Sequence, residues 1–313
     1  MNETYYNKKF YKKSYAYQKN KNVNLGIKAL SNEIYSDKRK FYIKTHFKNY
    51  FNTIDKTILH TKLREFFKRE DYPLVDSIMY LLNRDVIYNN KVIQEDNGVM
   101  AGTPLSGYLA NVFMNKTDHE LGKLKNIYYI RYADDVLILT NDNLDIDIIE
   151  SKTKPLDIVL NKGKTKTGVI KDGLTMLGFY FEKNIVDIEK DKIDKMKTRI
   201  KRRSIWFRKW AKDNGVNNRV MVKTFVKGMN EKFYSRDEED RMNWSRWYFS
   251  SINTDRSLKI VDDYMIQYIR YLVSGKHLGY KKHSEVTYDL IKELGYVPLV
   301  RMYWKYKKGG LVL

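Results

Sequence analysis

The stretch YYIRYADDVLILT, residues 128–140, constrains the fold more than any other part of the sequence. Two adjacent acids, Asp134 and Asp135, interrupt aromatic and aliphatic residues that are typical of buried strands. Side chains alternate along a strand, so neighbouring carboxylates converge only in a tight turn. We therefore predict a hairpin with one strand through Arg131 and a second strand from Val136. Most Asp-Asp pairs are solvated turn residues, but the apolar flanks here place the turn between two buried strands, which favours a metal site. Two divalent cations about 3.5–4 Å apart would suit a displacement reaction at phosphorus.

The charge of the chain limits its partners. Among 313 residues, 59 Lys and Arg stand against 38 Asp and Glu, and the formal net charge is +21. This excess favours a polyanion, and nucleic acid fits better than an anionic membrane surface. The 26 tyrosines interspersed among the basic residues suit stacking on bases and cation–π contacts, with replacement of Phe as the alternative explanation.

Three features that the sequence lacks narrow the class further. No apolar run approaches the roughly 18–20 residues of a membrane span. The first residues, MNETYYNKKFYKKSYAYQKNK, have no apolar core of a signal peptide. The absence of Cys excludes disulfides, thiolate zinc sites and cysteine nucleophiles. We expect a soluble, cytoplasmic protein with no membrane partner.

Three further motifs accompany the acid pair. In chain order they are HFKNYFNTIDKTIL (46–59), GTPLSGYLANVFMNKTDHEL (102–121) and LNKGKTKTGVIKDGLTMLGFYF (160–181). Together with RYADDVLILT they resemble, in the same order, the bacterial reverse transcriptases of the group II intron, retron and phage-defence types. The most similar are the defence-associated or abortive-infection "unknown group" enzymes. The resemblance implies an α+β fold, namely a right-hand polymerase palm with reduced fingers, followed by a basic, mostly helical thumb.

The resemblance and the local composition together predict domain limits. Residues 1–45 form a basic arm and reduced fingers, residues 46–190 the palm, and residues 191–313 a helical thumb that binds nucleic acid. The last region begins with a strongly basic helical pattern. Its expected buried stripe is Ile193, Met196, Ile200, Ile205 and Trp206.

The resemblance also implies roles for individual residues. Asp134 is the principal metal ligand and Asp135 the supporting carboxylate, for Mg²⁺ or Mn²⁺. Phe51 takes the aromatic steric-gate position that selects deoxynucleotides, and Lys164 lies near the triphosphate. The expected substrate-binding set is Phe47, Phe51, Gly102, Thr103, Pro104, Ser106, Tyr132 and Lys164. The expected primer grip is Met176, Leu177 and Gly178, and the expected phosphate-backbone contacts are Lys201, Arg202, Arg203 and Arg208.

Single residues of this set also have simpler explanations. Lys164 is one of several surface lysines, Phe51 fits a hydrophobic core, and Ser106 fits a helix cap. The ordered motifs favour the functional roles.

The sequence departs from the family pattern at three places. His46 stands where the first palm strand usually carries its metal-binding Asp, so it joins the catalytic candidates. Imidazole binds Mn²⁺ or Zn²⁺ but is a poor ligand for Mg²⁺, and it removes a negative charge. Only 45 residues precede His46, so the fingertips are minimal or absent. Ala101 stands where the family often has Gln.

Three functions remain open on the sequence. The first is a polymerase that makes DNA with unusual or no ordinary templating, and the intact Tyr132 to Asp135 motif with Lys164 favours it. The second is a non-catalytic subunit that supports an active polymerase, and His46 favours it. The third is an RNA-binding protein of an intron or retron.

Expected partners are RNA and DNA, a non-coding RNA, and a partner reverse transcriptase or a second copy of the chain. The sequence shows no endonuclease signature and no zinc ligand cluster. By analogy, this favours a bacterial anti-phage defence system over a mobile intron.

Overall fold

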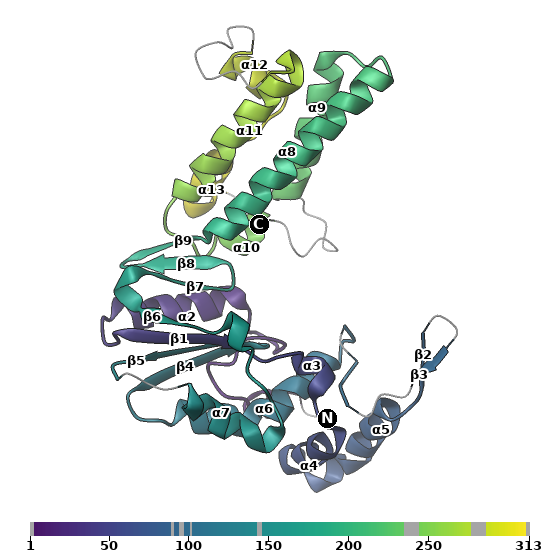
Figure 1. Ribbon diagram of the computed structural model, residues 1–313, viewed down its shortest axis with the longest axis vertical. Helices are drawn as coiled ribbons and strands as arrows, with labels where there is room; N and C mark the ends of the chain where they lie inside the picture. Colours follow the sequence, from purple (N-terminus) through teal and green to yellow (C-terminus); the bar gives the residue numbers. More distant parts are fainter. Residues whose placement is uncertain are drawn as a thin grey trace. The chain divides into compact units, whose positions relative to one another are not determined.

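The computed structural model describes residues 3–88, 91–93, 97–100, 102–142, 146–234, 244–276 and 286–310 (Figure 1). The chain forms two compact units, each treated by itself. The first comprises Met1–Leu177 with Glu182–Asn184, and the second comprises Gly178–Phe181 with Ile185–Leu313.

The first unit mixes helices with antiparallel strands. Its helices are α1 (Glu3–Asn7), α2 (Val23–Tyr35), α3 (Tyr50–Thr53), α4 (Lys56–Phe66), α5 (Tyr72–Leu82), α6 (Ser106–Gly122) and α7 (Asp147–Thr153). Its strands are β1 (Phe41–His46), β2 (Val86–Tyr88), β3 (Lys91–Ile93), β4 (Ile127–Tyr132), β5 (Asp135–Thr140), β6 (Lys166–Val169) and β7 (Leu174–Met176).

The central sheet has the strand order β4-β5-β1-β6, and the neighbouring strands are antiparallel. Strand β5 is an inner strand that begins at Asp135, and its residues Val136 to Leu139 are fully buried. A strand whose successive residues are all buried must be covered on both faces. Helices α2 and α6 both pack against β4, and Figure 1 shows them on different sides of the sheet.

Local sequence signals explain how β1 leads into α4. Asp55 is the N-cap of α4, and its carboxylate accepts a hydrogen bond of 2.8 Å from the Ile58 amide. This cap satisfies a helix N–H that lacks an intrahelical partner. The buried face of α4, with Leu59, Leu63 and Phe66, joins the core beneath the sheet. The sequence predicts a strand before His46 and a helix capped by Asp55 with Leu59, Leu63 and Phe66 on its apolar face, and the structure confirms all three.

The second unit begins with the strands β8 (Phe179–Glu182) and β9 (Ile185–Ile188) and is otherwise helical. Its helices are α8 (Lys190–Asp213), α9 (Asn218–Tyr234), α10 (Trp244–Tyr248), α11 (Arg256–Ser274), α12 (Tyr288–Glu293) and α13 (Leu299–Lys307). Helix α11 packs against α8, α9 and α13. It ends at Gly275, a glycine that the sequence predicts as a helix stop and that adopts a φ of 72°.

Two sequence predictions need correction and one is untested. On α8, Ile193, Met196 and Ile200 are buried, but Ile205 and Trp206 are 44% and 57% exposed. The helical period continues the buried face of α8 through Ser204 and Phe207 instead. The sequence also predicts a helix near residues 144–160, but α7 covers only Asp147–Thr153. It further predicts a hairpin that turns at Asn89 and Asn90, and these two residues lie outside the described part of the chain. Among the described residues, no helix is long and apolar enough to cross a membrane.

Candidate active site

The predicted acid hairpin is present. Strand β4 ends at Tyr132 and β5 begins at Asp135, so Ala133 and Asp134 form a two-residue turn. Ala133 has a φ of 55°, a left-handed conformation that is strained for a residue with a β-carbon. The Arg131 guanidinium holds this turn by donating a hydrogen bond of 2.9 Å from Nη1 to the Ala133 carbonyl.

A buried ion pair fixes Arg131 itself. Its Nε and Nη2 atoms lie 2.8 and 2.6 Å from the two carboxylate oxygens of Asp118 on α6. Nη2 also donates to Asn111 Oδ1 at 3.2 Å, and the Tyr129 hydroxyl donates to Asp118 at 2.7 Å. The sequence did not predict this ion pair. The only hint of it in the sequence is an arginine within an otherwise apolar strand, because a buried arginine needs a charged or polar partner.

His46, the last residue of β1, faces both acids. In the β1–β5 register it lies opposite Asp135, and its Nε2 atom is 2.6 Å from Asp135 Oδ1. Its Nδ1 atom is 4.0 Å from Asp134 Oδ2. The next amide, that of Phe47, donates a hydrogen bond of 3.1 Å to the Asp134 carbonyl. The end of β1 therefore brings an imidazole to the acid pair.

The charges at these three residues are coupled. Asp134 and then Asp135 raise the pKa of His46 to about 9, against the opposing effect of burial. By distance, Asp135 is the closer partner. The pKa of Asp134 is lowered, first by His46 and to a smaller extent by the charge of Lys164. At neutral pH the His46 imidazolium thus stands between two carboxylates.

These side chains are the candidate metal ligands of the acid turn. Among the described residues, no three acidic or histidine side chains already converge on one point as a metal cluster. Asp135 Oδ1 is buried, and it forms an ion pair with His46 Nε2 at 2.6 Å. A buried carboxylate oxygen requires a compensating positive charge, which the His46 imidazolium supplies and which a bound divalent cation would also supply. The donor set of two carboxylates and one imidazole fits Mn²⁺ better than Mg²⁺.

The two phenylalanines expected near substrate lie in different environments. Phe47 is 2% exposed, so its ring belongs to the core and only its amide reaches the acid turn. Phe51, on α3, is half-buried and packs against Tyr50 with ring centroids 5.4 Å apart. Of the two rings, only that of Phe51 has an accessible face.

The loop before α6 is tied to the same helix α3. The Val99 amide donates a hydrogen bond of 2.9 Å to the Phe51 carbonyl. Gly102, with a φ of 93°, and the following Thr103 and Pro104 are exposed. The buried Ser106 hydroxyl donates to the Thr103 carbonyl at 2.7 Å, so this group closes the loop. Ala101 lies outside the described residues.

The remaining predicted substrate-binding and primer-grip residues are buried to different extents. Tyr132 is half-buried opposite Asp135 in the β4–β5 register, and Lys164 is exposed in a short 3₁₀ turn. The Met176 side chain is fully buried, so it acts as core. Leu177 and Gly178 both have positive φ, 54° and 85°, as in a tight hairpin turn that glycine favours.

The basic residues predicted to contact phosphates on α8 also divide into two kinds. Lys201 and Arg202 are exposed. Arg203 packs against a glycine of α9, and Arg208 donates a hydrogen bond of 2.6 Å to the Leu272 carbonyl near the end of α11. Arg203 and Arg208 therefore contact other helices of the unit, and of the four predicted phosphate contacts only Lys201 and Arg202 are exposed.

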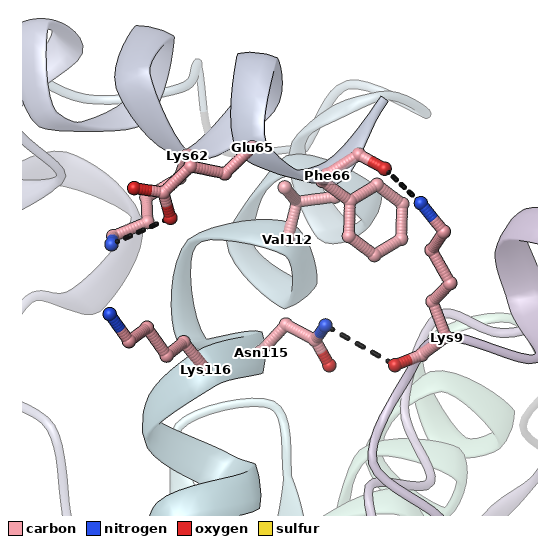
Figure 2. Close-up of a pocket in the computed structure, with 7 residues that line it drawn as sticks. All are labelled: Lys9, Lys62, Glu65, Phe66, Val112, Asn115 and Lys116. Atoms are coloured by element: carbon pink, nitrogen blue, oxygen red, sulfur yellow. Dashed lines mark hydrogen bonds and ion pairs between the residues drawn. The ribbon is translucent and has the colours of Figure 1, made fainter. Parts of the chain in front are cut away.

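A cavity of about 190 Å³ lies between α4, α6 and the N-terminal arm (Figure 2). Its lining is Lys9, Lys62, Glu65, Phe66, Val112, Asn115 and Lys116. Lys62 pairs with Glu65 at 3.1 Å, and Lys9 donates to the Phe66 carbonyl at 2.6 Å. None of the lining residues belongs to the acid site.

Several solved structures of polymerases are similar to this chain at low sequence identity. Telomerase from Candida albicans, in complex with a fragment of telomeric RNA, has 12% sequence identity and a TM-score of 0.45; the alignment covers 96% of this chain and 54% of the telomerase chain. For apo telomerase from Candida tropicalis, the identity is 14% and the TM-score 0.45, and the alignment covers 80% of this chain and 44% of the telomerase chain. For an RNA-dependent RNA polymerase of a human picobirnavirus, the identity is 13% and the TM-score 0.39, and the alignment covers 50% of this chain and 33% of the polymerase chain.

The chain thus spans about half or less of the length of these structures. No curated protein sequence matches the chain. The family model described as "Reverse transcriptase (RNA-dependent DNA polymerase)" matches residues 1–181, which contain the acid hairpin, His46 and the Gly102 loop. By this match and by its palm-like arrangement of helices and antiparallel strands, the chain belongs to the reverse transcriptase family.

Proposed function

We propose that this protein is a metal-dependent DNA polymerase that adds deoxynucleotides to a primer. The observation that carries the proposal is the turn of Asp134 and Asp135 between β4 and β5, which lies beside His46 at the end of β1 and is held by hydrogen bonds from Arg131 and Phe47. In this proposal residues 1–45 act as reduced fingers, residues 46–190 as palm and residues 191–313 as thumb.

The proposed reaction is nucleotidyl transfer. The primer 3′-hydroxyl oxygen bonds to the α-phosphorus, the bond from this phosphorus to the bridging oxygen breaks, and pyrophosphate leaves while the hydroxyl proton passes to water. Asp134 and Asp135 would hold divalent cations, which would neutralise the charge that develops on the entering and leaving oxygens. Phe51 would lie beside the sugar, and the Lys164 ammonium would be available to the leaving pyrophosphate.

The test is incorporation of labelled deoxynucleotides by the purified full chain, with its co-purifying RNA and with Mg²⁺ or Mn²⁺. Asp134→Asn and Asp135→Asn should abolish incorporation without unfolding the protein. The exposed Asp142→Asn serves as the matched control and should leave incorporation unchanged. Equal incorporation by all four proteins would contradict the proposal.

A second function is favoured by one observation, the imidazole in place of a carboxylate at His46. In this alternative the chain is a non-catalytic subunit, or an RNA-binding scaffold, that supports an active polymerase. Incorporation that appears only when a second polymerase is added, and that survives Asp134→Asn, would favour this alternative.

We further propose a role in bacterial anti-phage defence with an associated non-coding RNA, a partner reverse transcriptase or a second copy of the chain. The motif resemblance supports this role. Sequencing of the RNA that co-purifies from cells, combined with a phage challenge of cells that carry Asp134→Asn, tests it. Unaltered phage sensitivity on loss of the acid would oppose it.

A further inference from the structure

The N-terminal arm extends the palm sheet at its β4 edge. The Arg131 amide donates a hydrogen bond of 3.1 Å to the Lys13 carbonyl, and the Tyr15 amide donates one of 3.1 Å to the Arg131 carbonyl. Ser14 pairs with Arg131 as a parallel bridge. The Ala16 carbonyl accepts a hydrogen bond of 2.7 Å from Asn111 on α6. The arm therefore joins the same network that holds the acid turn.

The arm is also fixed on either side of this pairing. Lys9 donates through Nζ to the Phe66 carbonyl at 2.6 Å, and its own carbonyl accepts from Asn115 at 3.2 Å (Figure 2). On the other side, the Lys21 ammonium donates to the carbonyls of Lys12 and Ser14, both at 2.9 Å. These contacts make the segment between Lys9 and Lys21 a closed, anchored loop.

This loop presents Tyr17 in a strained conformation. Tyr17 has a φ of 53°, in the left-handed region that bulky side chains rarely adopt. Such backbone strain costs on the order of 1–3 kcal/mol, and it persists where surrounding contacts determine the conformation. Conformations of this kind are concentrated at functional sites.

The Tyr17 ring lies beside the residues expected to contact the nucleotide. It meets the Phe51 ring edge-on, with centroids 5.9 Å apart and an interplanar angle of 86°. It also lies on Gly107 in the first turn of α6, where a β-carbon would come within 2.3 Å of the ring. Gly107 thus permits an approach that no other residue allows. The ring nevertheless remains accessible, because Tyr17 is 53% exposed.

The charge of the acid turn reaches this ring. Burial, and then the Asp134 carboxylate, raise the pKa of Tyr17. The ring of Tyr17 in turn contributes to the raised pKa of Tyr132, after burial. The Asp134 carboxylate thus acts electrostatically on the Tyr17 ring, which contacts Phe51 directly.

We propose that Tyr17 is a substrate-positioning residue, whose ring forms with Phe51 an aromatic wall against which the sugar and base of an incoming deoxynucleoside triphosphate stack. This inference rests on the proposed function, and it identifies a contact that the motifs do not contain. Aromatic rings recognise nucleotides of any base, because every base presents a π face.

The test is binding of dATP with Mn²⁺ to the full chain in the absence of primer, measured by isothermal titration calorimetry. Asn tolerates a positive φ, so Tyr17→Asn removes the ring and retains the loop. We expect this change to weaken dATP binding by about tenfold. Tyr17→Phe should bind within about threefold of the native chain. Tyr80→Asn on α5, which removes another exposed tyrosine ring, should bind like the native chain.

The outcomes separate this inference from the proposed function. Native affinity in Tyr17→Asn, equal losses in Tyr17→Asn and Tyr17→Phe, or no dATP binding by the native chain would each overturn the role of the ring. If the native chain binds dATP and Tyr17→Asn does not, yet no primer is extended, the inference stands and the polymerase proposal fails. Tyr17→Gly replaces Tyr17→Asn if the latter does not fold, because glycine adopts positive φ without strain.

Discussion

The Arg131 guanidinium and the Asp118 carboxylate form a buried, bidentate ion pair, with side chains 0% and 2% exposed. The pair joins β4 to α6. Through Nη1, Arg131 also holds the carbonyl of Ala133 in the acid turn. The geometry of the candidate active site therefore depends on an ion pair that is itself buried in the protein interior.

Asp118→Asn should lower the free energy of unfolding by about 3–5 kcal/mol, because it leaves the Arg131 charge buried without a counterion. Urea unfolding followed by circular dichroism measures this loss. The matched control is Glu120→Gln on the same helix, which removes an exposed pair with Lys152 at 3.3 Å. The control should cost less than about 1 kcal/mol. Equal losses in the two variants would show that burial of the Asp118 pair has no energetic consequence.

Gly107→Ala should destabilise the native chain by about 1–3 kcal/mol, because the new β-carbon meets the Tyr17 ring. The same change should cost less in a Tyr17→Asn background, so the double-mutant cycle should show a coupling free energy of about 1 kcal/mol or more. Gly163→Ala is the control, since its nearest neighbour would be at 3.5 Å. Additive effects of the changes at residues 107 and 17 would mean that the ring does not rest on Gly107.

His46→Asp should change the response to metal. Three carboxylates without a cation repel one another, so the variant should melt at a lower temperature than the native chain in EDTA. Added Mg²⁺ should then raise its melting temperature more than that of the native chain, because the hard cation gains an oxygen ligand. His46→Asn supplies the neutral control. If Mg²⁺ shifts all three proteins equally, His46 lies outside the metal site.

The stability of the native chain in EDTA should fall as the pH rises from about 6.5 to 9. The pKa of His46 is raised to about 9 in the folded protein, so between these values the folded state holds a proton that the unfolded state releases. The stabilisation is complete below pH 6.5 and is lost as the pH passes through 9. Thermal melts at a series of pH values measure this slope. His46→Asn should flatten it, and an unchanged slope would exclude this residue as its cause.

Two arginines of α8 should respond differently to substitution. Arg202→Ala removes an exposed cation. It should reduce the slope of the logarithm of the RNA-binding constant against the logarithm of the salt concentration by about 1. Arg208→Ala removes the hydrogen bond to the Leu272 carbonyl and should lower the free energy of unfolding by about 1–2 kcal/mol. Filter binding at several salt concentrations and urea unfolding distinguish the two effects. An Arg208 variant with native stability and a reduced salt slope would reverse this assignment.

The sequence by itself determined the local elements of this protein. The strand–turn–strand around Asp134 and Asp135, the Asp55 cap of α4 and the Gly275 stop of α11 all follow from residues close together in the chain. Their periodicity and their side-chain to backbone hydrogen bonds form within a few residues, so a single segment contains the needed information.

Only the tertiary structure decided which distant groups meet. Arg131 finds Asp118, Tyr17 reaches Phe51 and Gly107, and Arg208 turns away from solvent toward α11. Each of these contacts joins different elements, and each depends on how those elements pack rather than on spacing along one of them. The same holds for α8, where Phe207 is buried and the neighbouring Trp206 is exposed. Which of the two rings is buried depends on which face of α8 the other helices cover.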